Sequence, residues 1–171
     1  DIHDFTFLVG EESIITRSNG FGASTSGQYN DHFMLLSNGT EITMSDIVNT
    51  VSDEVFNSYF FNLGYSYNDL YFIDANLRRD GSSKFAPGNR WSTFWSLGAM
   101  WNMKNEKFLQ DVKWLDQARL RLSYGTTGNA GIGNYAYMGL VGPYSVTYNG
   151  KPGWGLSSVD NPKLQWETVK A

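Results

Sequence analysis

Period-two alternation of apolar and polar side chains dominates this chain, and helical periodicity is nearly absent. Four segments carry an apolar or aromatic side chain at almost every second position: 58–67, 70–79, 91–102 and 117–125. Residues 4–11 and 165–171 show a shorter version of the pattern. Successive side chains of a β-strand point to opposite faces of its sheet, so each segment is predicted to be a strand with one apolar face. The predicted fold class is therefore all-β, with antiparallel strands.

The connections between these segments alternate between long and short. Asn68-Asp69 is a two-residue turn of the type that joins the strands of a hairpin. Residues 12–57 and 126–164 lack periodicity and are far longer than ordinary connections. The long loops are therefore predicted at one end of the strands and the shorter turns at the other. The 103–116 connection is an imperfect fit, because it is no shorter than the 80–90 loop.

Two environments fit strands of this kind. In a soluble β-sandwich the apolar face packs against a second sheet, whereas in an outer-membrane barrel it faces lipid and the polar face lines a wet lumen. Four charged residues belong to the polar faces, and such charges in a sandwich core would need partners to offset their desolvation. They are Asp74, Arg78, Arg119 and Arg121. The pattern leaves two alternatives open, a barrel wall and a soluble carbohydrate-binding β-sandwich whose aromatic residues form a sugar platform.

Aromatic side chains stand at the ends of two predicted strands. Tyr59 and Tyr67 end one of them, and Trp91 and Trp101 end the other. Ten residues at a rise of ~3.3 Å, tilted by ~40°, span roughly 25 Å along a membrane normal. That length matches the apolar band between the aromatic girdles of a membrane barrel. These four residues are therefore predicted to form a lipid-interface girdle.

The composition argues against several classes of function. The chain has 171 residues and a net charge of -4, which disfavours a nucleic-acid binder because such proteins carry a basic face. It has no cysteine, and its two histidines, His3 and His32, are too isolated for a catalytic or metal site. The glycines between Gly125 and Gly133 lack the Gly-Lys-Ser/Thr of a phosphate-binding loop. No enzymatic activity, cofactor or metal site is therefore predicted.

Several motifs in residues 58–171 resemble a known family. They are YFIDANLRRDGSSKF at 71–85, NRWSTFWS at 89–96, WN at 101–102 with NEKF at 105–108, RLRLSYGTTGN at 119–129 and NPKLQWE at 161–167. In that order they are similar to the SusC/RagA-type TonB-dependent transporters of Bacteroidetes outer membranes. Residues 1–57 match less distinctively.

The resemblance implies that residues 1–171 are a fragment of a transmembrane β-barrel of about 22 strands. The implied location is the outer membrane of a Gram-negative, Bacteroidetes-like bacterium. The implied function is TonB-dependent active import of nutrients, either glycan or oligopeptide fragments. The implied partners are a SusD-like surface lipoprotein, outer-membrane lipid, lipopolysaccharide and the TonB–ExbB–ExbD complex. Neither a plug domain nor a TonB box is visible in this sequence, so the TonB complex would act through parts outside it.

The resemblance also gives a role to individual residues. The 12–57 and 126–164 segments are predicted to be long extracellular loops. Trp154 and Arg78 are candidates for contact with substrate or with the SusD-like lipoprotein, which would act as a lid. Each has a structural alternative, since Trp154 could fold its loop back on itself and Arg78 could pair with Asp80 to stabilise a turn. By parity Arg79 faces outward, where lipopolysaccharide phosphates would lie. Four residues are predicted to line the lumen or face the plug: Asp74, Asn76, Arg119 and Arg121.

Overall fold

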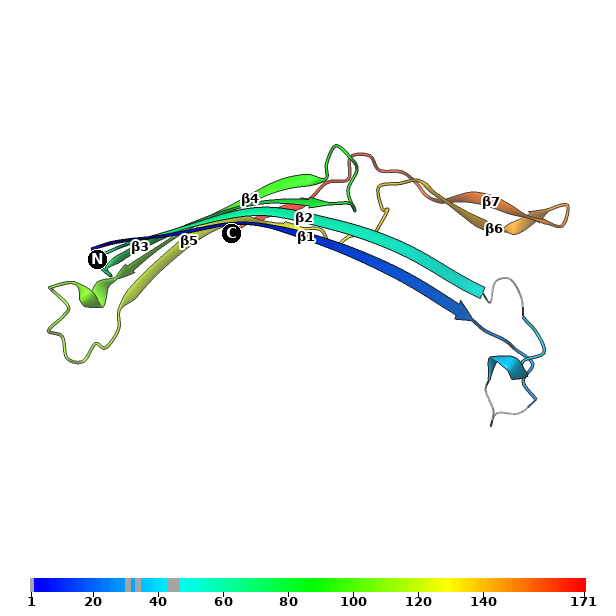
Figure 1. Cartoon of the computed structure of the whole chain (residues 1–171), viewed down its shortest axis with the longest axis horizontal. Helices are drawn as coiled ribbons and strands as arrows, with labels where there is room; N and C mark the ends of the chain where they lie inside the picture. Colours follow the sequence, from blue (N-terminus) through cyan, green and yellow to red (C-terminus); the bar gives the residue numbers. More distant parts are fainter. Residues whose placement is uncertain (1, 30–31, 33–34, 43–46) are drawn as a thin grey trace. The chain divides into compact units, whose positions relative to one another are not determined.

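The computed structural model describes residues 2–29, 32, 35–42 and 47–171. The chain divides into two units, one made of Asp1–Ile14 with Val55–Ala171 and the other of Ile15–Glu54. One sheet has the strand order β1-β2-β3-β4-β5-β8, and β6 pairs with β7 in a separate sheet (Figure 1). The strands are β1 His3–Ala23, β2 Ile47–Tyr67, β3 Tyr71–Ser82, β4 Trp91–Asn102, β5 Arg119–Asn129, β6 Leu140–Tyr148, β7 Lys151–Ser158 and β8 Glu167–Lys170.

The predicted all-β, antiparallel fold is confirmed. Every pairing from β2 through β5 to β8 is antiparallel. Asn68 and Asp69 both have positive φ, 51° and 53°, as the tight turn of a hairpin requires. The two described helices, η1 (Leu36–Asn38) and η3 (Met103–Asn105), are single 3-10 turns. No helix in the described ranges has the length and apolar character to cross a membrane.

The predicted loop 12–57 is wrong over much of its length. β1 continues to Ala23 and β2 already begins at Ile47, so both strands extend far into this segment. Nearly every β1 side chain is exposed, whichever face it lies on. Residues 12–23 do not alternate regularly, because Ile14 and Ile15 are neighbours and Gly20 and Gly22 have no side chain, so periodicity gives no signal there. Residues 30–31, 33–34 and 43–46 of the predicted loop lie outside the described residues.

The predicted loop 126–164 also contains regular structure. β5 continues to Asn129, and β6 and β7 form a hairpin with two register irregularities. Asn149 and Gly150 make its turn, with φ of 50° and 73°. Asn-Gly is the dipeptide that most strongly favours such a hairpin turn, so the sequence did contain a signal for this element.

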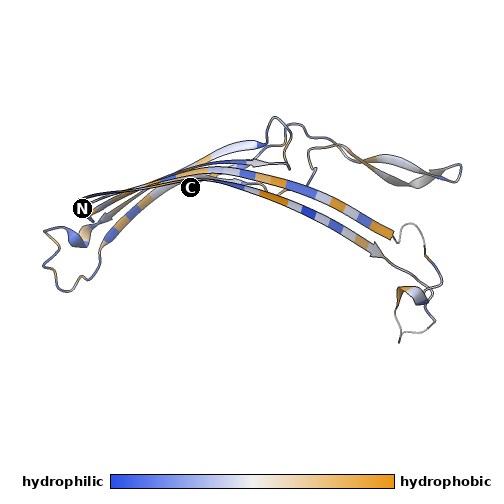
Figure 2. Ribbon diagram, viewed as in Figure 1, coloured by the Kyte–Doolittle hydropathy of each residue, from blue (hydrophilic) through white to orange (hydrophobic). Residues whose placement is uncertain are grey.

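Few hydrophobic side chains are buried in the described part of the chain. The buried ones are Phe85, Ala86, Phe94 and Trp166. Three of them form a cluster, which we call the rim cluster: Phe85, Phe94 and Trp166, flanked by Phe56, Ala130, Ile132 and Leu164. Most large hydrophobic side chains are instead exposed on the strands, and hydrophilic and hydrophobic residues alternate along β1 and β2 in Figure 2. The sheet therefore leaves one apolar face uncovered by this chain.

Candidate functional site

The uncovered apolar face of the sheet carries aromatic side chains near each end. At the end with the Asn68-Asp69 turn, Tyr67, Tyr71 and Trp101 are successive register partners on β2, β3 and β4. Their neighbouring ring centroids are 6.4 Å apart in both pairs. At the end with the 83–90 loop, Tyr59 stacks on Trp91 at 5.9 Å. The four residues predicted as a girdle thus fall into two rows, which we call the turn-end row and the loop-end row.

Aliphatic side chains between the two rows are open to the surroundings. Ile73, Leu97 and Leu122 are 45%, 52% and 67% exposed. A soluble sandwich would bury this face under a second sheet, and no second layer lies on it in the described residues. The described residues therefore do not form a sandwich by themselves.

A carboxylate links the turn-end row to the connection that follows β4. Glu106 Oε1 accepts hydrogen bonds from the Tyr71 hydroxyl at 2.7 Å and from the Trp101 indole at 3.2 Å. Both aromatic side chains thus direct their polar groups toward the short-turn end and keep their rings on the apolar face. This amphipathic arrangement is typical of Tyr and Trp where an apolar medium meets water. The sequence indicated the aromatic residues but did not predict the hydrogen bonds that Glu106 accepts from them.

The opposite face of the sheet brings together the residues predicted to line a lumen. Asp74 and Asn76 pair in register with Gly98 and Ser96. Arg121 and Arg119 pair with Met100 and Asn102 on the other side of β4. All four predicted residues therefore share one face, and Asn76 donates a hydrogen bond to Ser96 Oγ at 3.1 Å. Whether this face meets a lumen or a plug domain stays a prediction.

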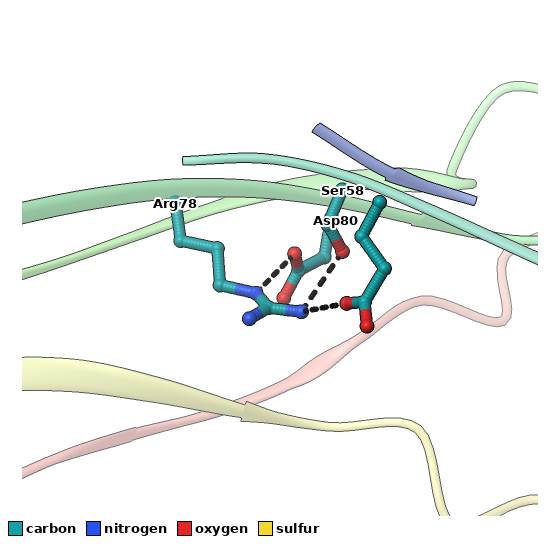
Figure 3. A network of polar contacts seen from close by, with 4 residues as sticks. Ser58, Arg78 and Asp80 are labelled. Carbon is teal, nitrogen blue, oxygen red and sulfur yellow. Dashed lines mark hydrogen bonds and ion pairs between the residues drawn. The ribbon is translucent and has the colours of Figure 1, made fainter. Parts of the chain in front are cut away.

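Arg78 lies on the same polar face but is engaged by this chain's own residues. Its Nε donates to Asp80 Oδ1 at 2.6 Å, and its Nη2 donates to Ser58 Oγ at 2.9 Å and to Glu12 Oε2 at 3.3 Å (Figure 3). Asp80 is 7% exposed and Ser58 only 1%. A buried carboxylate needs such a partner to offset its desolvation. The structural alternative for Arg78, a pair with Asp80, therefore describes its contacts.

The rim cluster closes the same face at the long-loop end. Trp166 lies 5.0 Å from the ring of Phe85 and 5.5 Å from that of Phe94. Its indole donates to the Arg90 carbonyl at 2.8 Å, and Asn89 Nδ2 donates to the Pro162 carbonyl at 3.3 Å. These contacts attach the 83–90 loop to the segment before β8. The sequence analysis did not predict this cluster, although Phe94 stands between Ser92 and Ser96 on the polar face of its strand.

Trp154 is not brought together with Arg78 in one site. It lies on β7, in the two-stranded sheet, as the register partner of Pro143. Its side chain is 73% exposed, which does not fit an anchor that packs its loop against itself. The two predicted candidates for substrate or lid contact therefore belong to different environments, one open and one internally bonded.

Comparisons with known proteins agree with this arrangement. The family model described as TonB dependent receptor-like, beta-barrel, matches residues 3–171. The chain is 37% identical to the TonB-dependent receptor SusC of Bacteroides thetaiotaomicron over 174 residues, covering 96% of this chain and 17% of SusC. It is 30% identical to the TonB-dependent receptor P39 of Formosa agariphila over 138 residues, covering 81% of this chain and 13% of P39.

A solved structure described as the RagAB peptide transporter is also similar. It superposes with a TM-score of 0.87 at 36% identity, over 99% of this chain and 19% of that chain. The RagAB peptide importer in an 'open-open' state gives a TM-score of 0.80 at 37% identity, over 97% of this chain and 18% of that chain. This chain therefore spans less than a fifth of the length of each of these relatives.

Proposed function

Because this chain belongs to the TonB-dependent receptor β-barrel family, in its SusC/RagA type, we propose that it forms part of the wall of an outer-membrane nutrient importer. The observation that carries the proposal is the exposed apolar face between two aromatic rows. In water such a face would cost about 25 cal/mol for each Å² of apolar surface. In a bilayer it replaces lipid–lipid contacts and that cost disappears.

The connections between strands support an orientation for the wall. Barrels of this class have short turns on the periplasmic side and long loops on the outer side. The Asn68-Asp69 turn would then mark the periplasmic side and the β6–β7 hairpin the extracellular side. The 103–118 connection would be periplasmic and the 83–90 loop extracellular, although the 103–118 connection is the longer of the two. The polar face, with Asp74, Arg119 and Arg121, would look into the lumen, where water or a plug domain solvates charges.

Cargo and partners follow by analogy with the relatives. We propose that the importer takes up glycan or oligopeptide fragments, and that a SusD-like surface lipoprotein covers its outer opening. The exposed Trp154 on β7 is the candidate in this chain for contact with that lid or with cargo, because an exposed indole can stack on a sugar ring or pack against a protein surface. Energy would arrive from the TonB–ExbB–ExbD complex through parts outside residues 1–171.

Single-cysteine variants of the full-length receptor test the wall directly. Ile73→Cys and Leu77→Cys occupy the apolar face of β3, and Asp74→Cys and Asn76→Cys the polar face. Each cysteine is labelled with a small environment-sensitive fluorophore, and the receptor is reconstituted into vesicles that contain nitroxide-labelled acyl chains. Fluorophores at 73 and 77 should be quenched by the lipid, and those at 74 and 76 should not.

This alternation is specific to a membrane wall. Equal quenching at all four positions, or no quenching at any of them, would contradict the proposal. Heat-modifiable migration in gels, which reports a folded barrel, serves as the control that each variant folds.

A further inference from the structure

A groove lies on the apolar face beside the loop-end row. It has a volume of ≈ 450 Å³, within the range of pockets that hold small ligands. Strand alternation places on this face the side chains of the lining residues Val9, Tyr59, Phe61, Leu77, Arg79 and Thr93. One row of register partners, Tyr59, Arg79 and Thr93, crosses the groove on β2, β3 and β4. The lining is therefore apolar except for a single cation and the hydroxyls of Tyr59 and Thr93.

The cation of the groove differs sharply from its neighbour along β3. Arg78, on the polar face, has Asp80 and Glu12 as ion-pair partners. Arg79 pairs with no carboxylate in the part of the chain that the structure describes, and its guanidinium lies 5.7 Å from the centre of the Trp91 ring. An arginine against hydrocarbon is costly unless its charge reaches the interface and finds an anion there. Arg79 is three residues before the end of β3, at the long-loop end, where the interface of the proposed wall would lie.

We propose that this groove is a binding site for a phosphate-bearing membrane lipid, with an acyl chain along Phe61 and Leu77 and the phosphate on Arg79. The inference rests on the proposed membrane wall, since only there does the groove meet lipid. Charge complementarity selects this occupant: a planar guanidinium donates two parallel hydrogen bonds to phosphate oxygens, and the only other polar side-chain groups of the lining are the uncharged hydroxyls of Tyr59 and Thr93. A lipid held there would also cover the Tyr59 and Trp91 rings.

Lipid binding to the full-length receptor tests the site. The probes are lipid A, which carries phosphate on a glucosamine headgroup, and the same lipid A after enzymatic removal of its phosphate. Native mass spectrometry of the receptor in detergent counts the lipids retained over a concentration series. Loss of a charge-assisted hydrogen-bond pair should make Arg79→Gln bind lipid A about tenfold more weakly. Arg79→Lys should lose less of the affinity for lipid A, because lysine keeps the positive charge but lacks the two parallel N–H donors of the guanidinium.

Two further variants address the two halves of the site. Thr93→Phe fills the groove and leaves Arg79 in place, so it should weaken binding of both probes. Lys163→Gln removes an exposed cation from the segment before β8 and should change neither. Dephosphorylated lipid A should bind Arg79→Gln and the unsubstituted receptor equally. Inorganic phosphate at millimolar concentration should displace neither probe, because it lacks an acyl chain.

Unchanged lipid A binding by Arg79→Gln, or displacement by inorganic phosphate, would overturn the proposal. So would an unchanged affinity in Thr93→Phe. These results are separable from a failure of the proposed function. If the cysteine variants show lipid contact at residues 73 and 77 while lipid A binding ignores Arg79, the wall stands and only the lipid site is lost.

Discussion

The two faces of the sheet differ in how far they expose large hydrophobic side chains. On the apolar face Leu97 and Leu122 are more than half exposed, whereas on the polar face Phe94 is 7% exposed inside the rim cluster. The side chains of the rim cluster are covered by other residues of this chain, and those of the apolar face are not. We infer that contacts within the protein stabilise the polar face, and that the surrounding medium stabilises the apolar face.

The same contrast appears between two consecutive arginines. Arg78 faces the polar side and makes three hydrogen bonds to groups of this chain. Arg79 faces the apolar side and contacts the Trp91 ring. These two adjacent arginines thus have different partners, because successive side chains of a strand point to opposite faces of the sheet. Substitutions matched across the two faces measure this dependence.

The largest effect is expected inside the rim cluster. Trp166→Ala removes a side chain that contacts Phe85 and Phe94 and donates to the Arg90 carbonyl. Truncating a buried Trp costs about 3–5 kcal/mol, which here loosens the 83–90 loop without unfolding a whole barrel. Hydrogen exchange of the amides at 83–90 in the full-length receptor should accelerate by about a hundredfold or more.

Trp154→Ala is the matched control for this prediction. Trp154 is 73% exposed, so its removal should change loop exchange and stability by at most about 0.5 kcal/mol. Equal effects of the two substitutions would show that the rim cluster does not hold the loop.

The next effect distinguishes the media on the two faces. Leu97→Arg puts a charge on the apolar face midway between the aromatic rows, which costs about 2–4 kcal/mol in a bilayer. Ser123→Arg puts the same charge on the polar face at nearly the same depth, since its register partner is Gly98. The yield of folded receptor in vesicles, read from heat-modifiable migration, should fall for Leu97→Arg alone. A sheet with water on both sides would tolerate both substitutions.

A smaller effect is expected from the carboxylates around Arg78. Asp80→Asn leaves the guanidinium without its buried counter-charge and should destabilise the outer end of β3 by about 1–3 kcal/mol. Glu12→Gln breaks a pair whose side chains are 43% and 45% exposed, so about 0–1 kcal/mol is expected. Hydrogen exchange of residues 78–82 compares the two variants. A larger effect from Glu12 than from Asp80 would reverse this assignment of partners.

Sequence periodicity predicted the strands whose two faces meet different surroundings. The 91–102 strand was predicted with its bounds because Trp and Leu alternate there with Ser and Gly. The part of β1 beyond Glu11 escaped prediction because the neighbours Ile14 and Ile15 and the glycines at 20 and 22 interrupt the alternation. The β6–β7 hairpin could have been predicted from Asn149-Gly150.

From the sequence, the alternation of side chains along a strand predicts which residues share a face, and the candidate site was predictable only to that extent. Parity places Arg78 and Asp80 on one face, because they are two residues apart. Glu12 joins them from 66 residues away, and only the register of three strands brings it there. The rim cluster likewise needs the path of the 159–166 segment. Asn161-Pro162 marks a turn in this segment, but the motif does not say which residues Trp166 contacts.

The smallest effect tests whether the turn-end row depends on this chain or on its medium. Glu106→Ala removes the acceptor of the Tyr71 and Trp101 hydrogen bonds, and about 0.5–1.5 kcal/mol is expected because water can reach both donors. Glu106→Gln keeps an acceptor oxygen and should destabilise this region by only about a few tenths of a kcal/mol. Hydrogen exchange of residues 103–118 measures the difference. If alanine leaves that exchange unchanged, then the interface alone positions the two rings, and the turn-end row belongs with the lipid-dependent face and owes nothing to Glu106.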